Sequence, residues 1–396
     1  MGEVKIEKWV YGGAGLARVE GQVTMVPYVM PGEEVKVEEV KRRAQMVEAR
    51  AVEWVTRSEQ RVEPRCAYFG KCGGCHYQMA PYEYQVAQKV EIVKEVFRRV
   101  GKLETPAEVE VVAGEPWGYR NRSQFHFGGH SLGYKAAGSD RVVDVDECPI
   151  SAPAINAALK KLRAKRRDRH FPRFLKEVEL FTNGERTMVN VLESERGVAK
   201  GFFEWLGQEI PGAADGALEY AAAGEKFRVS HKSFFQVNRF LVDRMVEAAL
   251  QGVEGERALD LYAGVGLFTI PLARRMAGVT GVESDGSAAR DLEFNAERAG
   301  VKVETRRMQS EQYLEGLTET PGFVLADPPR AGLGKGVVKN LVRLGPGRIT
   351  LVSCDPSTQA RDVAMLCAGG YQVERMAVLD VFPQTYHVET VVGLKR

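Results

Sequence analysis

From about residue 240 onward, short apolar stretches alternate with longer amphipathic ones in a regular order. Helical patterns such as 287–299, which stops at Gly300, separate the apolar stretches. Strands that alternate with helices form a parallel sheet covered by helices on both faces. The sequence therefore predicts an α/β domain over 236–396. Its expected strands are 258–261, 279–283, 303–306, 323–326 and 349–352, followed by a terminal antiparallel hairpin of 372–380 and 387–394.

The rest of the 396 residues is long enough for one or two further domains. Residues 1–58 alternate β-branched and charged residues between Gly and Pro turns, which predicts a small β-barrel. Residues 59–235 are predicted as a central α+β domain. In that domain we expect a helix at about 81–100, strands near 123–127 and 178–181, and a loop at the Gly/Ala-rich 212–224.

The net charge of +2 gives no general attraction to nucleic acid, so such binding needs a local cluster of cations. One basic run lies at 160–169, where a solvated helix face is an equally good interpretation. No apolar stretch reaches the length of a membrane span, and the first ten residues lack the core of a signal peptide. These features predict a cytoplasmic protein.

A glycine turn follows the first strand of the α/β domain. Gly264 and Gly266 let the backbone turn tightly, so that a ligand can approach the amino end of the next helix. Glu283 ends the following strand, where a carboxylate can accept both hydroxyls of a ribose. Thr269 stands where a dinucleotide-binding motif has its third glycine, which disfavours NAD. Together with the terminal hairpin, these residues favour a methyltransferase that uses S-adenosylmethionine.

Cys354 lies at the end of an apolar strand, the position at which parallel sheets carry their chemistry. A thiol there is a candidate nucleophile, and a small buried core residue is the alternative. Carbon C5 of uracil becomes nucleophilic only after a thiolate has added to C6, and a base must afterwards remove the C5 proton. Cys354 and Glu389 fit these two roles. Asp327 is followed by two prolines that hold its loop stiff, so it can present a fixed acceptor.

Four other cysteines can converge on one centre, because a Gly-Gly pair gives the loop between them a tight backbone. In a reducing compartment such thiols indicate metal binding rather than disulfides. Four thiolates suit a zinc ion or an iron–sulfur cluster, and their spacing does not decide between the two, although a Cys-Pro pair leans toward iron–sulfur. The residues concerned are Cys66, Cys72, Cys75 and Cys148.

Over nearly its whole length the chain resembles the RNA uracil-C5 methyltransferases, specifically the bacterial 23S ribosomal RNA enzymes with a TRAM domain and an iron–sulfur cluster. The resemblance rests on the four cysteines, the segment Ser233-Phe-Phe-Gln-Val-Asn238, and the motifs around Asp327, Cys354 and Glu389. It implies a class I S-adenosylmethionine methyltransferase (Rossmann-like) domain behind an N-terminal TRAM/OB-like β-barrel that binds RNA. It further implies that the four cysteines hold a [4Fe-4S] cluster.

The resemblance also implies roles for single residues. Gln236 would lie against the cofactor and the target base, and Asp327 at the junction of the two. Tyr262 and Glu283 would contact S-adenosylmethionine, while Cys354 and Glu389 keep the roles of nucleophile and base. Leu267 departs from the asparagine that many relatives have, which removes one side-chain contact to the cofactor.

These observations predict methyl transfer to C5 of a uridine in 23S ribosomal RNA by a monomer without DNA or membrane partners. Two alternatives stay open: a transfer RNA uridine-C5 methyltransferase, and a catalytically idle RNA-binding or ribosome-assembly factor. A cytosine-C5 enzyme is disfavoured because Ser353, and not a proline, precedes Cys354.

Overall fold

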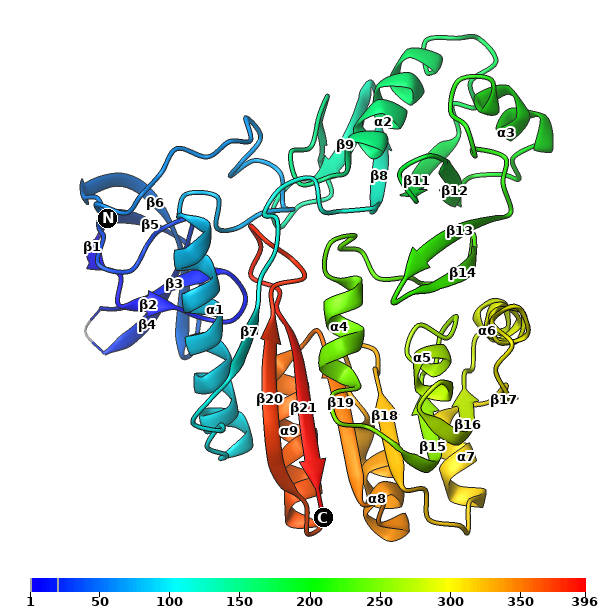
Figure 1. Ribbon diagram of the computed structural model, residues 1–396. Helices are drawn as coiled ribbons and strands as arrows, with labels where there is room; N and C mark the ends of the chain where they lie inside the picture. The colour runs from blue at the N-terminus through cyan, green and yellow to red at the C-terminus, as the bar shows by residue number, and fades with distance from the viewer. Residues whose placement is uncertain (1, 20) are drawn as a thin grey trace.

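The computed structural model describes residues 2–19 and 21–396, and its largest element is an eight-stranded sheet (Figure 1). The strand order is β17-β16-β15-β18-β19-β21-β20-β7. Strands β15 to β19 run parallel, whereas β21 is antiparallel to both of its neighbours. The strands are β7 (Glu110–Val112), β15 (Gly255–Leu261), β16 (Met276–Val282), β17 (Val303–Arg306), β18 (Phe323–Ala326), β19 (Arg348–Ser353), β20 (Gln372–Leu379) and β21 (Glu389–Lys395).

Strand β18 is buried throughout, and β19 is buried after its first residue, because helices cover both faces of the sheet. In β19, Ile349 and Leu351 join the core on one face, and Val352 joins the core on the other. The predicted parallel strands, the terminal hairpin and the α/β fold class are thereby confirmed. One face carries α1 (Tyr82–Val96), α7 (Ser310–Gly316), α8 (Gly334–Leu344) and α9 (Pro356–Ala368), and the other carries α4 (Val242–Ala249), α5 (Thr269–Ala273) and α6 (Gly286–Ala299).

Helix α1 and strand β7 belong to this sheet although they lie far upstream in the chain. β7 pairs in parallel with β20, and α1 packs beside α9. Helix α1 ends in a π-helical turn, Phe97–Gly101, so the predicted helix 81–100 is interrupted at its last turn. Its buried face carries Gln85 and Lys89, whose partners lie in the β20–β21 connection.

The N-terminal part is a six-stranded sheet curled into a half-barrel, in the order β1-β5-β6-β4-β3-β2. Register shifts along the β5–β6 pair bend the long strands, as β-bulges do. A small apolar core that includes Val4, Ile6, Val26 and Val35 fills the concave side. The strands are β1 (Gly2–Lys5), β2 (Lys8–Trp9), β3 (Ala14–Val19), β4 (Gln22–Pro27), β5 (Glu34–Arg43) and β6 (Met46–Thr56).

The central part contains a five-stranded sheet, β10-β9-β8-β11-β12, and a separate hairpin of β13 and β14. The predicted loop at 212–224 is wrong over its second half, because β13 pairs there with β14. Leu218, Tyr220 and Ala222, every second residue of β13, point into the core. The sequence does not reveal this two-residue period, because alanines occupy buried and exposed positions alike. The elements are β8 (Arg122–Gly128), β9 (Ser131–Lys135), β10 (Val142–Asp144), α2 (Pro153–Lys165), β11 (Leu175–Thr182), β12 (Thr187–Ser194), α3 (Lys200–Gly207), β13 (Ala217–Ala222) and β14 (Glu225–Ser230).

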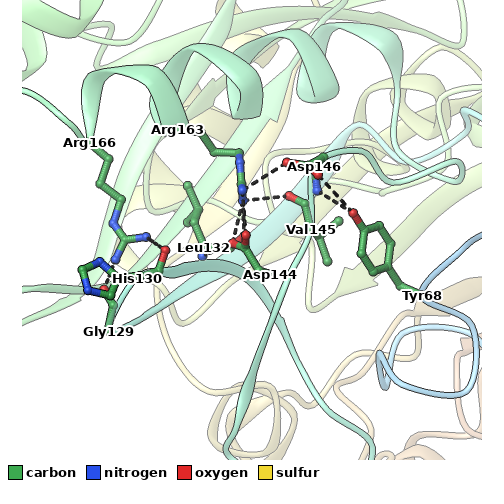
Figure 2. A network of polar contacts seen from close by, with 9 residues as sticks. All are labelled: Tyr68, Gly129, His130, Leu132, Asp144, Val145, Asp146, Arg163 and Arg166. Atoms are coloured by element: carbon green, nitrogen blue, oxygen red, sulfur yellow. Dashed lines mark hydrogen bonds and ion pairs between the residues drawn. The ribbon is translucent and has the colours of Figure 1, made fainter.

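The basic run begins on α2, and two of its arginines have a structural role (Figure 2). Arg163 pairs with Asp144 at 2.7 Å and with Asp146 at 3.1 Å. Arg166 donates to the backbone carbonyls of Gly129 and His130. Both therefore fasten α2 to the sheet. In the described part of the chain, no helix combines the length and the apolar character that crossing a membrane requires.

Candidate active site

Four of the predicted site residues meet at one edge of the large sheet. Tyr262, Asp327 and Cys354 each follow a parallel strand, and such strands end at a common edge. Glu389 begins the antiparallel strand β21, so it lies at the same edge. Ser353 pairs with Thr390, which makes Cys354 and Glu389 the next neighbours across the ladder. This edge faces the N-terminal and central parts, where the red β20–β21 connection rises in Figure 1.

Cys354 and Glu389 both hold their protons more tightly than they would in water. Burial raises the pKa of the Cys354 thiol to about 11; the charge of Glu389 adds to this rise and that of Arg330 opposes it. Burial, with a smaller effect of Asp327, raises the pKa of the Glu389 carboxyl well above its usual range, and Arg330 again opposes. Before substrate binds, Cys354 is therefore a neutral thiol, and the neighbouring Glu389 carboxyl binds a proton strongly.

Asp327 and Gln236 form a polar pair next to the thiol. Gln236 Nε2 donates to Asp327 Oδ2 at 3.3 Å. Burial raises the pKa of Asp327 to about 7, and the Gln236 hydrogen bond partly offsets the rise. Two asparagines hold the segment of Gln236 in place: Asn121 Nδ2 donates to the Gln236 carbonyl at 3.0 Å, and Asn238 Nδ2 donates to the Val381 carbonyl at 3.0 Å. A nonregular segment thus becomes a fixed wall of the site.

The glycine turn after β15 contains residues with positive φ, a backbone conformation that residues other than glycine rarely adopt. Gly264 and Gly266 have φ of +55° and +95°, and Tyr262 between β15 and the turn has φ of +63°. A Cβ on Gly266 would lie 2.7 Å from Leu292 Cδ1, whereas nothing lies within 4 Å of a Cβ on Gly264. Glu283 Oε2 accepts a hydrogen bond from the Gly264 N–H at 2.8 Å. The space over Gly264, beside a carboxylate, is open for a ligand.

The four remaining predicted ligand residues line one cavity of about 400 Å³ in the central part: Cys66, Cys72, Cys75 and Cys148. The Gly73 N–H donates to the Lys135 carbonyl at 3.0 Å, and a Cβ on Gly73 would lie 3.3 Å from the Ala137 backbone. The Gly-Gly pair thus lets the cysteine loop approach the end of β9. Within residues 2–19 and 21–396, no three His, Cys, Asp or Glu side chains stand as ligands around one metal ion.

Comparison with known proteins identifies the family. The chain is 33% identical to the 23S rRNA (uracil(1939)-C(5))-methyltransferase RlmD of Salmonella choleraesuis, over 99% of this chain and 96% of that protein. The chain belongs to the RNA uracil-C5 methyltransferases. It is also 32% identical to an uncharacterized RNA methyltransferase of Thermotoga maritima, over 99% of this chain and 98% of that protein. Residues 215–396 match the family described as tRNA (Uracil-5-)-methyltransferase.

A solved structure supports the same assignment. The crystal structure of Pyrococcus abyssi tRNA (uracil-54, C5)-methyltransferase, in complex with S-adenosyl-L-homocysteine, is 28% identical. It covers 99% of this chain and 100% of that chain, with a TM-score of 0.76. The predicted family, fold class and enzyme class are confirmed: the chain is an S-adenosylmethionine-dependent RNA (uracil-C5)-methyltransferase.

Sequence reasoning missed one buried carboxyl of this methyltransferase. Asp260, inside β15, is fully buried, and its Oδ2 accepts a hydrogen bond from Thr269 Oγ1 at 2.5 Å. Burial raises its pKa to about 7, with Asp327 and Glu283 adding to the rise. Thr269 is thus the partner of Asp260, which explains why the place of a third glycine carries a hydroxyl. The signal in the sequence was an acidic residue within an otherwise apolar strand.

The β20–β21 connection, which leads into Glu389, is held by buried polar contacts from α1. Lys89 Nζ binds Asp380 Oδ1 at 2.6 Å and the Phe382 carbonyl at 3.0 Å, with both charged side chains at most 2% exposed. Gln85 exchanges hydrogen bonds with the backbone and side chain of Gln384, which has φ of +68°. These contacts hold the segment that leads to Glu389 in place. No local pattern in the sequence predicts them.

Proposed function

We propose that this methyltransferase transfers a methyl group to C5 of a uridine in 23S ribosomal RNA, with Cys354 as nucleophile and Glu389 as base. The observation that carries the proposal is the register of β19 and β21, in which the two residues are neighbours on one ladder. The ribosomal substrate is supported by the relative named for 23S rRNA, which matches over nearly the full length of both chains.

In the proposed reaction, the Cys354 thiol releases its proton to solvent water, and its Sγ forms a bond to C6 of the uracil ring. The electrons of the C5–C6 double bond move toward O4, and the enolate that results is nucleophilic at C5. S-adenosylmethionine, when bound, supplies the methyl group to that carbon from its sulfonium sulfur. Glu389 then takes the C5 proton, the double bond re-forms, and the Sγ–C6 bond breaks. The target base has to leave its stack to reach Cys354.

The raised pKa of Glu389 suits this cycle. Burial beside Asp327 makes the ionised Glu389 carboxylate a stronger base, so in that form it can take the C5 proton once the ring has been methylated. The high pKa of Cys354 means that the thiolate forms only when the proton has somewhere to go, which limits side reactions of the resting thiol.

The proposed cofactor site lies between the glycine turn and the Asp327–Gln236 pair. Two observations fit S-adenosylmethionine there: the open space over Gly264, and the buried Asp260 Oδ1, which lacks a hydrogen-bond partner within residues 2–19 and 21–396. The residues proposed to hold the cofactor are Gln236, Tyr262, Gly264, Gly266, Glu283 and Asp327.

We also propose that the four cysteines hold a [4Fe-4S] cluster. Four thiols on one cavity of about 400 Å³ suit a polynuclear group in donor chemistry and in volume. Such a group would join the loop after the N-terminal half-barrel to the central sheet. Iron and acid-labile sulfide analysis, with the visible absorption bands of a cluster, tests the proposal. Stoichiometric zinc without iron would overturn it.

The test of the function is methyl transfer from labelled S-adenosylmethionine to unmodified 23S ribosomal RNA and to transfer RNA, followed by nucleoside analysis. We expect 5-methyluridine in 23S RNA with the wild type and none with Cys354→Ala. Label in transfer RNA alone would keep the mechanism and replace the substrate. This second candidate is favoured by the family matched over 215–396 and by the Pyrococcus abyssi structure. No label in either RNA would favour an idle RNA-binding factor.

A further inference from the structure

The N-terminal half-barrel is docked tightly on the rest of the molecule through Trp9. This side chain is 1% exposed, and its ring stacks on that of Tyr77 with centroids 4.1 Å apart. Tyr84 of α1 adds an edge contact at 5.5 Å, and Trp9 Nε1 donates to the Val29 carbonyl at 2.6 Å. Stacked and hydrogen-bonded aromatic residues define the position of both partners. The turn that follows Trp9 therefore has a fixed place relative to the large sheet.

Tyr11, two residues further on, reaches the loop of the proposed nucleophile. Its hydroxyl lies 3.4 Å from the Cys354 carbonyl oxygen and 3.3 Å from Asp355 Oδ2. The other carboxylate oxygen of Asp355 caps α9, because it accepts hydrogen bonds from the N–H groups of Ser357 and Thr358 at 2.9 and 3.1 Å. The hydroxyl of Tyr11 thus contacts Cys354 and Asp355, the two residues that connect β19 to α9.

The same turn also contacts the loop of the proposed base. The Tyr11 ring meets the Tyr386 ring edge-on at 5.6 Å, and Tyr386 lies three residues before Glu389. Gly13 has φ of +89°, and a Cβ on it would lie 2.9 Å from the His76 ring and 3.1 Å from the Tyr386 ring. The turn 11–13 therefore lies between the Cys354 loop, which follows β19, and the Tyr386 loop, which precedes β21.

We propose that Tyr11 is a positioning residue, which fixes the Cys354 loop against the Glu389 loop and makes the N-terminal half-barrel part of the catalytic unit. The inference rests on the roles proposed for Cys354 and Glu389. It gives the half-barrel a task besides RNA binding: the nucleophile is in place only when the half-barrel is docked.

The test is Tyr11→Phe, which removes the hydroxyl and keeps the ring. With RNA that carries 5-fluorouridine, Glu389 has no C5 proton to remove, so the Cys354 adduct accumulates and its rate of formation can be measured. We expect that rate and kcat to fall about 5- to 10-fold, as the loss of one hydrogen bond of about 1 kcal/mol predicts, with KM for RNA within about twofold. Amide hydrogen exchange over 354–358 should become faster.

The matched control is Lys8→Met. It breaks another contact of the N-terminal part, the 2.6 Å ion pair of Lys8 with Glu95 on α1, and it touches neither catalytic loop. We expect wild-type adduct formation in this variant. Wild-type rates and exchange in Tyr11→Phe would overturn the inference while the proposed function stands. A wild-type enzyme that forms no adduct would overturn the role of Cys354, and the inference with it.

Discussion

Replacing Glu389 by glutamine is expected to make Cys354 more reactive toward an alkylating agent while it strongly slows methyl transfer. The glutamine keeps the shape of the side chain and removes the charge that Glu389 carries when ionised, which helps to raise the pKa of the thiol. Opposite residues of an antiparallel ladder have Cβ atoms about 5 Å apart. At that distance and an effective dielectric constant of about 20, the repulsion between a carboxylate and a thiolate is roughly 3 kcal/mol. Because the thiol is only half-buried, screening by water reduces this energy.

We therefore expect the pKa of Cys354 to fall from about 11 by about one unit, which is about 1.4 kcal/mol. At pH 9 a pKa lower by one unit gives about ten times more thiolate, but each thiolate becomes about threefold less nucleophilic. Alkylation by iodoacetamide at pH 9 should therefore be about three- to fourfold faster in Glu389→Gln. Methyl transfer should fall by a factor of about 100 to 10,000, as the loss of a general base predicts.

The assay is mass spectrometry of the alkylated peptides, with Cys367 on α9 as the internal reference and Cys354→Ser as the blank. Glu374→Gln is the matched control: this glutamate lies near the start of β20, at the opposite edge of the sheet, so the reactivity of Cys354 should not change. If Cys354 in Glu389→Gln reacts at the wild-type rate or more slowly, the electrostatic reasoning about the pair is refuted.

Three further outcomes are expected. Lys89→Met leaves Asp380 charged and unpaired in the core, so the free energy of unfolding in urea should fall by about 3–5 kcal/mol; a loss below about 1 kcal/mol would contradict this. Gly266→Ala combines a φ of +95° with a Cβ close to a leucine, so it should destabilise the fold by about 1–3 kcal/mol, measured as a lower Tm. Lys160→Glu on the exposed side of α2 should weaken RNA binding and reduce the slope of log affinity against log salt by about 0.7–0.9. Lys302→Glu, directly before β17 and at the end of the large sheet opposite to the candidate active site, should leave this slope unchanged.

The sequence predicted those parts of the fold whose pattern is local. The stretch 323–326 coincides with β18, because a short apolar run buried on both faces has a clear signature. The stretch 303–306 also coincides with β17, a half-exposed strand in the regular alternation of strands and helices. Strand β7 escaped notice because its three residues are defined only by pairing with β20, which lies more than 250 residues downstream. The same holds for Lys89, whose burial on α1 makes sense only beside Asp380.

The candidate site shows the same division. Cys354 was singled out because it follows an apolar strand, the position at which parallel sheets carry their chemistry, and Glu389 because the chemistry needs a base. That the two are cross-strand neighbours depends on the antiparallel insertion of β21 between β19 and β20, which periodicity does not specify. Tyr11 could not be found from the sequence, because its contacts with 354–355 join segments separated by more than 340 residues. The roles of these residues stay predictions until they are tested.

The shared ladder of β19 and β21 has a consequence for how enzymes of this architecture can diversify. The proposed nucleophile and base are spaced by backbone hydrogen bonds. Positions of the β20–β21 connection outside the contacts of Asp380, Phe382, Gln384 and Tyr386 can therefore change without altering that spacing. An insertion of one residue inside β21 would instead turn every following side chain to the other face of the sheet. Substitution at these other positions can therefore reshape the surroundings of the site, while the strands and the anchoring contacts keep the spacing of Cys354 and Glu389 constant.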